Sequence, residues 1–335
     1  MSAERAGARP AGRALGTAGT PAGTVLGVDL GGTKLRAALA GPDGAVLAER
    51  VERTAHGDGG AIPGQVARAL ATLCARTGVA PGAVRAAGLA LPVAVDPDSG
   101  ASWSTQNVPG LAGVDVTGAF EQALGMPVVL DNDGNCAALG EGRSGAAVGV
   151  ADFVVVVIGT GIGSGIVSGG RLLRGAHGGG GEIAFLPLGT DPWDERNRVQ
   201  GAFESAVAGP AIRGRVDAAL QAGGQTVLRP GARLADVARA AAAGDLLATR
   251  LLDEEARLIA LGIAALAAVV DPELVVLSGG VGAVDGLRDP VATHLATLTE
   301  RPPALVTGLL GVRAPLVGAL GLALELAGRG GRRRG

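Results

Sequence analysis

Aromatic residues and cysteines are scarce in this 335-residue chain. It has no Tyr, two Trp and four Phe, so a platform of aromatic side chains for stacking nucleic-acid bases is not expected. Cys74 and Cys136 are its only cysteines and form no CxxC pair, which excludes a disulfide scaffold and a cysteine zinc site and fits a reducing, cytoplasmic compartment. A net charge of −2, with no basic central region, argues against a nucleic-acid partner.

Long uninterrupted apolar segments are also missing. The longest, Leu258–Val270, has 13 residues and is too short to cross a bilayer as a helix. Residues 153–170 are uncharged but are broken by six glycines, which favours a hairpin. Residues 1–23 carry three Arg and no apolar stretch, so we expect a disordered tail rather than a signal peptide. No membrane partner is expected.

A glycine-rich turn between two apolar strands occurs twice. The first turn, residues 31–34, follows Asp29, and a shift of 128 positions places Gly31 on Gly159 in the second turn, Gly159-Thr160-Gly161. Backbone N–H groups that point at one spot act as fixed partial positive charges, so each turn is suited to hold an anion. Two such turns facing each other could clamp a polyphosphate.

The first turn does not match two common phosphate motifs. Gly27 and Gly32 have the spacing of a Walker loop, but Thr33 and Lys34 are in the wrong order and a strand follows instead of a helix. Neither turn contains the GxGxxG of a dinucleotide site. A phosphate-binding hairpin and an ordinary glycine hairpin remain open, and Lys34, the chain's only Lys, favours the first. Asp29 could then hold Mg²⁺ through water.

Several carboxylates are placed to act on a substrate. Asp131, Asn132 and Asp133 lie between a predicted strand and a predicted helix, where a carboxylate can accept a proton from a substrate hydroxyl or simply cap the helix. Glu182 follows a run of glycines, and Glu204 lies downstream. Carboxylates suit sugar recognition because each accepts two hydroxyl hydrogen bonds. Solvation at the surface is the alternative, and for Glu204 taken alone it is favoured.

Other motifs carry weaker signals. Gly279 and Gly280 follow a predicted strand and could approach a nucleotide base or ribose, although a tight structural turn is equally consistent. His177 is predicted to be a loop residue. His56 and His294 are predicted to be surface residues without partners.

Alternating strands and helices predict an α/β protein. Strands are expected over Val25–Asp29, Leu35–Ala40, Ala45–Arg50, Val84–Leu91, Pro127–Leu130 and Glu273–Leu277, and helices over 62–77, Val114–Leu124, 131–141, 201–221, 232–242, 245–270 and Ala314–Ala327. Two related halves predict two lobes with a ligand-binding cleft between them. We expect a tail over 1–23, a first lobe over 24–131 that is completed by the helix 314–327, a second lobe over 132–313 and a flexible tail over 328–335.

Together these residues resemble the ROK family of sugar kinases and sugar-responsive repressors, over nearly all of the chain after residue 23. Five segments carry the resemblance: residues 29–34 and 158–165 are similar to the two phosphate motifs, 132–141 to the catalytic segment, 171–182 to the family signature and 277–280 to the adenosine-side loop.

The resemblance implies a two-lobed actin-like ATPase fold, ribonuclease H-like, with duplicated lobes and a central cleft. It implies that Asp133 is the general base and that Asn107, Asn132, Asp133, Glu182 and Glu204 contact the sugar. Phosphate and nucleotide contacts fall on Asp29, Gly31, Gly32, Thr33, Lys34, Gly159, Thr160, Gly161, Gly279 and Gly280. It further implies ATP and Mg²⁺, with Asp29 as the metal-holding residue, and a homodimer.

The chain departs from the family pattern in one segment. The family commonly has ExGH followed by a zinc-binding CxCGxxGCxE, whereas here Phe185 replaces the His and residues 191–204 contain no Cys. Only Glu204 remains, so zinc is not expected. This form resembles a subset with many regulators, but the DNA-binding domain of those regulators is not expected here.

These observations predict an ATP- and Mg²⁺-dependent sugar kinase, glucokinase-like, acting on glucose or a related hexose. The alternative is a non-catalytic sugar sensor that regulates a partner, and a third, weaker possibility is an actin-type ATPase scaffold. The sequence leaves open which sugar is bound and whether the donor is ATP or another phosphoryl compound such as polyphosphate.

Overall fold

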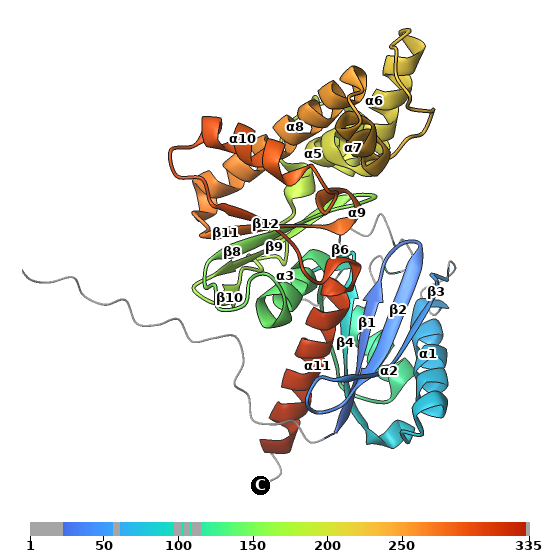
Figure 1. Cartoon of the computed structure of the whole chain (residues 1–335). Coiled ribbons are helices and arrows are strands. Elements are labelled where there is room, and N and C mark those ends of the chain that lie inside the picture. The colour runs from blue at the N-terminus through green and yellow to red at the C-terminus, as the bar shows by residue number, and fades with distance from the viewer. Residues whose placement is uncertain are drawn as a thin grey trace, which may run out of the picture.

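The computed structural model describes residues 23–55, 61–96, 102–103, 108, 111 and 115–332. Asn107 and His56, both named above, lie outside the described residues. The described chain folds into two halves, each built on a mixed β-sheet, with two helices between them (Figure 1).

The first sheet has the strand order β3-β2-β1-β4-β7. Its strands are β1 (Thr24–Leu30), β2 (Lys34–Ala40), β3 (Val46–Arg53), β4 (Val84–Leu91) and β7 (Val128–Asn132). The strands β1 to β3 form an antiparallel meander, and β4 and β7 run parallel to β1. The turn of the β1–β2 hairpin points toward the other half of the molecule in Figure 1.

Helices cover both faces of this sheet because its strands are apolar on both sides. The side chains of Leu26 and Val28 face α1 (Ala61–Thr77) and α2 (Val116–Leu124). Val25, whose side chain points to the opposite face because side chains alternate along a strand, packs on the C-terminal helix α11 (Ala314–Arg332). The C-terminal helix thus packs on the first sheet, and its assignment to the first lobe stays a prediction.

The second sheet repeats the arrangement of the first, with the order β10-β9-β8-β11-β12. Its strands are β8 (Phe153–Ile158), β9 (Ile162–Ser168), β10 (Arg171–Leu172), β11 (Leu274–Ser278) and β12 (Ala304–Thr307). Again the first three are antiparallel, and β11 runs parallel to β8 and β12. The same order and the same strand directions in both sheets explain why the glycine turn occurs twice in the sequence.

One face of the second sheet packs on a large helical layer, and the other packs on α3 (Asp133–Ser144). The helical layer contains α5 (Ala202–Val207), α6 (Gly209–Gln221), α7 (Leu234–Ala242), α8 (Leu246–Val270) and α10 (Arg288–Leu298). Shorter elements are β5 (Ala94–Val95), β6 (Ser102–Trp103), α4 (Glu195–Gln200), α9 (Gly279–Gly282) and the 3₁₀ turns Pro81–Ala83, Ile183–Phe185 and Gly311–Arg313.

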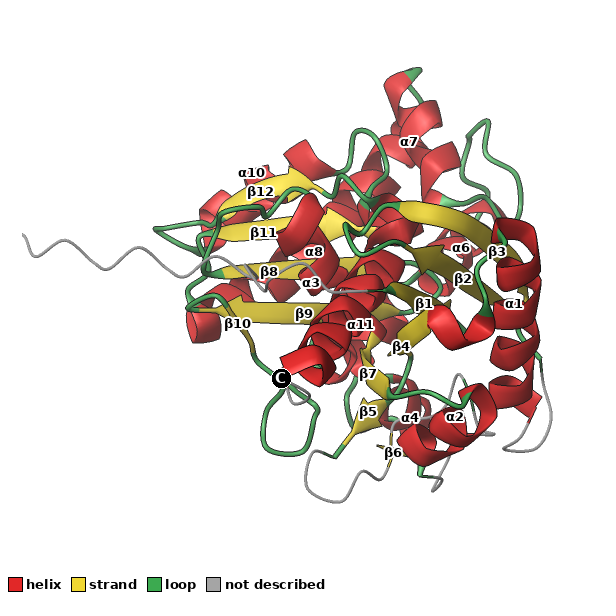
Figure 2. Ribbon diagram, turned by 90° about the horizontal axis from the view of Figure 1, so that it is seen from below, coloured by secondary structure: helices red, strands yellow, loops and turns green. Residues whose placement is uncertain are grey.

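The helices α3 and α11 lie against each other between the two sheets (Figure 2). Glycines allow this close approach: a Cβ on Gly140 would lie 2.3 Å from the carbonyl oxygen of Ala314, and one on Gly318 would lie 1.9 Å from that of Cys136. α3 leads from β7 of the first sheet to β8 of the second, and α11 follows β12 of the second sheet and packs on β1 and β4 of the first. Their contact therefore fixes how the two halves meet.

Among the described residues, one segment, Gly311–Arg329, is long and apolar enough by length and composition to cross a membrane. Most of this segment, from Ala314 onward, belongs to α11, which packs on β1, β4 and α3. That packing accounts for its apolar composition.

Sequence predictions about one helix interior, one helix end and one histidine differ from the structure. The helix predicted over 201–221 is two helices, because Pro210 has no backbone N–H to continue a helix and Ala208 is extended. The C-terminal helix runs to Arg332, beyond its predicted end at Ala327, so residues 328–332 are not a separate tail. His294 has a partner, since its Nε2 lies 2.7 Å from Oδ1 of Asp253. The lobe boundaries at 24–131 and 132–313 stay predictions.

Candidate active site

The first glycine turn is closed by hydrogen bonds that leave two amides available. Gly31 N–H donates to the carbonyl oxygen of Lys34 at 2.9 Å. Thr54, just after β3, donates its N–H to the carbonyl oxygen of Thr33 and its Oγ1 hydroxyl to that of Gly31. The N–H groups of Gly32 and Thr33 donate no hydrogen bond to any described residue. Thr33 and Lys34 are exposed. This end of the β1–β2 hairpin can therefore receive an anion.

The second glycine turn is held in a similar way. Gly159 N–H donates to the carbonyl oxygen of Gly161 at 2.8 Å, and the first residue of α6, Gly209, donates its N–H to Gly159 at 2.8 Å. Within the described part of the chain, the N–H groups of Thr160 and Gly161 donate no hydrogen bond. Both turns thus offer two consecutive amides.

Glu204 contacts the second turn. Its Oε2 accepts a hydrogen bond from Ile162 N–H at 2.9 Å. A Cβ on Gly161 would lie 2.5 Å from that same oxygen, so a larger residue there would displace the Glu204 carboxylate. The expectation from Glu204 taken alone, a solvated surface residue, is wrong, and its position at the turn agrees with the site role that the family resemblance assigns. No local signal could have shown this, because 42 residues separate the two bonded groups.

Asp133 begins α3 with part of its carboxylate unused. The cap of the helix is Asn132, whose Oδ1 accepts from Gly134 N–H at 2.8 Å and from Asn135 N–H at 3.4 Å. Asp133 also accepts from Gly134 N–H, through Oδ1. Its Oδ2 has no hydrogen-bond partner among the described residues. Since Asn132 supplies the cap, Asp133 is available for chemistry.

Ser164 of β9 brings Glu182 to the start of α3. Its Oγ donates to the carbonyl oxygen of Gly181 at 2.8 Å. Cβ atoms added to Gly134 and Gly181 would both lie 2.7 Å from the Ser164 carbonyl oxygen, and Gly181 has a φ of +95°. As a result, Asn132 Nδ2 lies 3.5 Å from Glu182 Oε1.

Asp29, Asp133, Glu182 and Glu204, hereafter the carboxylate cluster, have raised pKa values. Burial raises the pKa of Asp133 to about 6 and those of Asp29 and Glu182 to about 7, and it also raises that of Glu204. The negative charge of Asp133 raises the pKa of Asp29 and Glu182 further, while the Arg36 guanidinium lowers that of Asp29. Such perturbed acids, gathered in one place from both halves, are typical of catalytic sites.

Asp29 fits a magnesium ion that is held mainly by water and phosphate. No group of three or more metal-binding side chains occurs in the described ranges. Mg²⁺ needs no such group, because it keeps several waters and uses one or two carboxylates plus substrate phosphates. Asp29 lies one residue from the end of β1, and no described residue forms a hydrogen bond with its carboxylate.

The turn after β11 approaches the second glycine turn. Gly279 has a φ of +83°, and a Cβ there would lie 2.3 Å from the carbonyl oxygen of Ile158, the residue before Gly159. Gly280 is exposed, with open space around its Cα. The backbone turn after β11 therefore lies beside the second glycine turn, with Gly280 open to solvent.

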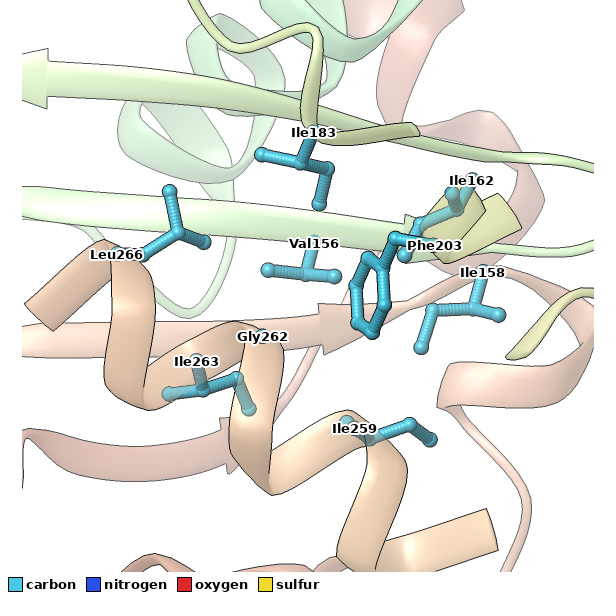
Figure 3. Close-up of a pocket in the computed structure, with 9 residues that line it drawn as sticks. All are labelled: Val156, Ile158, Ile162, Ile183, Phe203, Ile259, Gly262, Ile263 and Leu266. Atoms are coloured by element: carbon cyan, nitrogen blue, oxygen red, sulfur yellow. The ribbon is translucent and has the colours of Figure 1, made fainter. Parts of the chain in front are cut away.

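An apolar pocket is lined by residues of β8, α5 and α8, among them Phe203, the residue before Glu204 in the sequence (Figure 3). The ring of Phe203 fills its centre, and a Cβ on Gly262 of α8 would lie 2.2 Å from the end of that ring. We expect Gly262→Ala to lower the free energy of unfolding by about 1–3 kcal/mol, because the buried ring must move. Urea denaturation measures this change.

Gly214→Ala on α6 is the matched control for this prediction. Nothing lies within 4 Å of a Cβ at Gly214, which is also helical and exposed. Alanine there should raise the stability by up to about 1 kcal/mol. Equal stability of the two variants would show that the Phe203 ring yields without cost.

Comparison with known proteins agrees with this geometry. The sequence model of the ROK family matches residues 25–326. The chain is 35% identical over 318 residues to the bifunctional enzyme NanE/NanK of Brucella suis, an alignment that includes 92% of this chain and 55% of that protein. The chain thus spans about half the length of this curated relative.

Two solved structures are similar over their whole length. The ROK hexokinase from Thermus thermophilus is 34% identical with a TM-score of 0.75, covering 90% of this chain and 99% of that one. The ROK family glucokinase from Streptomyces griseus, in complex with glucose and AMPPNP, is 29% identical with a TM-score of 0.71, covering 90% and 100%. The chain therefore belongs to the ROK family, and its two mixed sheets have the two-lobed actin-like ATPase fold that the motifs predicted.

Proposed function

We propose that this chain is a sugar kinase that transfers the γ-phosphate of ATP to a hydroxyl group of a hexose. The observation that carries the proposal is the Oδ2 of Asp133, to which no described residue donates a hydrogen bond. It belongs to a carboxylate cluster that also contacts the second glycine turn through Glu204. Relatives named glucokinase and N-acetylmannosamine kinase support a sugar as acceptor, and a relative's complex with AMPPNP supports a nucleoside triphosphate as donor.

In the proposed reaction, Asp133 accepts the proton of the attacking hydroxyl. Asn132, Glu182 and Glu204 hold other hydroxyls of the sugar, so that the reacting oxygen is in line with the phosphate. The free amides of Gly32, Thr33, Thr160 and Gly161 hold phosphate oxygens, with Lys34 at the edge of the first turn. Alignment and charge stabilisation supply most of the catalysis in phosphoryl transfer.

Asp29 would hold Mg²⁺ through its water shell. When bound, the ion neutralises charge on the phosphate oxygens during transfer. Gly31 and Gly159 close the two turns, and Gly279 and Gly280 are assigned to the nucleoside side of the cleft. A glucokinase-like specificity is the finer proposal, together with a homodimer in the cytoplasm and no structural zinc.

A coupled assay of ADP release over a panel of sugars tests the proposal. Glucose, mannose, N-acetylmannosamine and a β-glucoside should be compared with a no-sugar control. ADP release that depends on one of these sugars supports the kinase. Sugar binding in calorimetry without ADP release would instead indicate a sensor, and ADP release that ignores sugar would indicate a simple ATPase.

The pH dependence of kcat/KM gives a further prediction. Asp133 must be ionised to accept a proton, and burial raises its pKa to about 6. We therefore expect kcat/KM for the sugar to start falling below about pH 7, where Asp29 and Glu182 take up protons, and to fall at least tenfold per pH unit below about 6. Initial rates between pH 5 and 8, with the coupling enzymes in excess at each pH, measure this. A rate that stays constant down to pH 5 would contradict the assignment of Asp133.

A further inference from the structure

The buried carboxylate of Asp131, just before the catalytic segment, bonds to Asn132, Asn135 and Arg174. Asp131 is 7% exposed and lies one residue from the end of β7. Its Oδ1 accepts from the backbone N–H of Asn132 at 2.9 Å and from Nδ2 of Asn135 at 2.7 Å. Its Oδ2 accepts from Nε of Arg174 at 2.8 Å and pairs with Nη2 of the same guanidinium at 2.7 Å. Asp131 therefore orders the start of α3 and binds Arg174 through two guanidinium nitrogens.

Arg174 belongs to the other half of the molecule. It lies in residues 173–181, hereafter the acceptor loop, which connects β10 to Glu182. The backbone of Arg174 also closes this loop, because its carbonyl oxygen accepts from Gly180 N–H at 2.7 Å. Arg174 therefore closes the acceptor loop through its main-chain carbonyl and binds Asp131 of β7 through its side chain.

The acceptor loop also contacts the first half at its tip. A Cβ on Gly178 would lie 2.1 Å from the carbonyl oxygen of Val95 in β5. Two guanidinium nitrogens converge on one oxygen of Asp131, so the pair restricts the orientation of the planar Arg174 head as well as attracting it. The Asp131–Arg174 pair therefore acts together with the Ser164–Gly181 contact in placing Glu182 relative to Asn132 and Asp133.

We propose that Arg174 is a positioning residue for the sugar acceptor, acting through Asp131. This inference rests on the proposed sugar kinase function. Arg174 is not expected to touch the sugar. It helps to set the separation of Glu182, on the acceptor loop, from Asn132 and Asp133 at the start of α3. Because misplacement by about 1 Å can cost about 10²-fold in rate, loss of the pair should weaken use of the sugar far more than use of ATP.

Arg174→Ala tests the proposal, with Arg171→Ala as the matched control. Arg171 is exposed in β10, and its side chain forms no hydrogen bond or ion pair with any described residue. We expect Arg174→Ala to lower kcat/KM for the sugar by about 10–100-fold, while KM for ATP stays within about twofold. Arg174→Lys keeps the positive charge but has one ammonium nitrogen in place of the planar guanidinium, so its kcat/KM for the sugar should lie between those of the wild type and Arg174→Ala. Arg171→Ala should match the wild type.

Chemical rescue separates positioning from a merely structural role. The Arg174 side chain is 49% exposed, so free guanidinium can reach the space it leaves beside Asp131. Guanidinium chloride at about 50 mM should restore several-fold of the lost kcat/KM in Arg174→Ala, whereas sodium chloride at equal ionic strength should not. Neither salt should raise the activity of Arg171→Ala or of the wild type.

The outcomes distinguish this inference from the proposed function. If the wild type phosphorylates a sugar and Arg174→Ala behaves like Arg171→Ala, the positioning role is wrong while the kinase stands. If Arg174→Ala loses sugar and ATP use equally, with a lower melting temperature and no rescue, the residue is structural and the inference is again overturned. A wild type that phosphorylates no sugar overturns both.

Discussion

Asp133→Asn is expected to lower kcat for sugar phosphorylation by about 10²–10⁴-fold, the range in which a general base contributes to catalysis. Asn has nearly the same shape as Asp and can still accept from Gly134 N–H, so the start of α3 should be preserved. It cannot accept the proton of the attacking hydroxyl. KM for the sugar should therefore change much less than kcat, and steady-state kinetics with the preferred sugar measures both.

Asp285→Asn makes the same chemical change outside the site. Asp285 is exposed and forms no hydrogen bond or ion pair among the described residues, so its variant should keep the wild-type kcat. Calorimetry should show that Asp133→Asn still binds the sugar, because Asn132, Glu182 and Glu204 remain. An Asp133→Asn protein with more than a tenth of the wild-type kcat would remove Asp133 from the role of base.

Parts of the fold were predictable because their signals are local. The strand Val84–Leu91 was predicted with the bounds that the structure has, since it is a continuous apolar run between turn residues. The helix α10 and the strand β12 were not predicted. The helix buries only Val291 and Leu295, and the strand has four residues, none of them buried, so neither shows a periodic apolar pattern.

The candidate site divides in the same way. The two glycine turns and Asp133 stand out because glycine and carboxylates at strand ends are visible within a few residues of sequence. The roles of Ser164, Thr54 and Arg174 are visible only in three dimensions. Arg174 is 43 residues from Asp131, and an isolated Arg in a glycine-rich segment carries no sign of its partner. Local sequence patterns do not reveal pairs between residues that are this far apart in the chain.

Arg215→Ala is expected to lower the free energy of unfolding by about 3–5 kcal/mol at pH 9, the usual cost of leaving a buried charge without its partner. Arg215, on α6, pairs with Glu255, on α8, which is 0% exposed, and also donates to the carbonyl oxygen of Ala206 at 2.6 Å. Glu255 Oε1 has no partner among the described residues, so Arg215 is the main compensation for this carboxylate.

The sign of the pH dependence follows from the same pair. Burial raises the pKa of Glu255 to about 8, although Arg215 lowers it. A carboxyl whose pKa is raised in the folded state contributes stability that is fully present below its unfolded pKa of about 4.5 and is lost as the pH rises through about 8. Removing Arg215 should raise the pKa further, so the deficit of Arg215→Ala should be smaller at pH 6 than at pH 9.

Two further variants decide whether the charge is the cause. Arg213→Ala, on the same helix, should change stability by less than about 0.5 kcal/mol, because the Arg213 side chain forms no hydrogen bond or ion pair among the described residues. Arg215→Met combined with Glu255→Leu should recover most of the loss, since apolar side chains of similar size need no partner. If the double variant is as unstable as Arg215→Ala, the hydrogen bond to Ala206 matters more than the charge. Arg215 would then act on the site by holding the end of α5, the helix that carries Glu204.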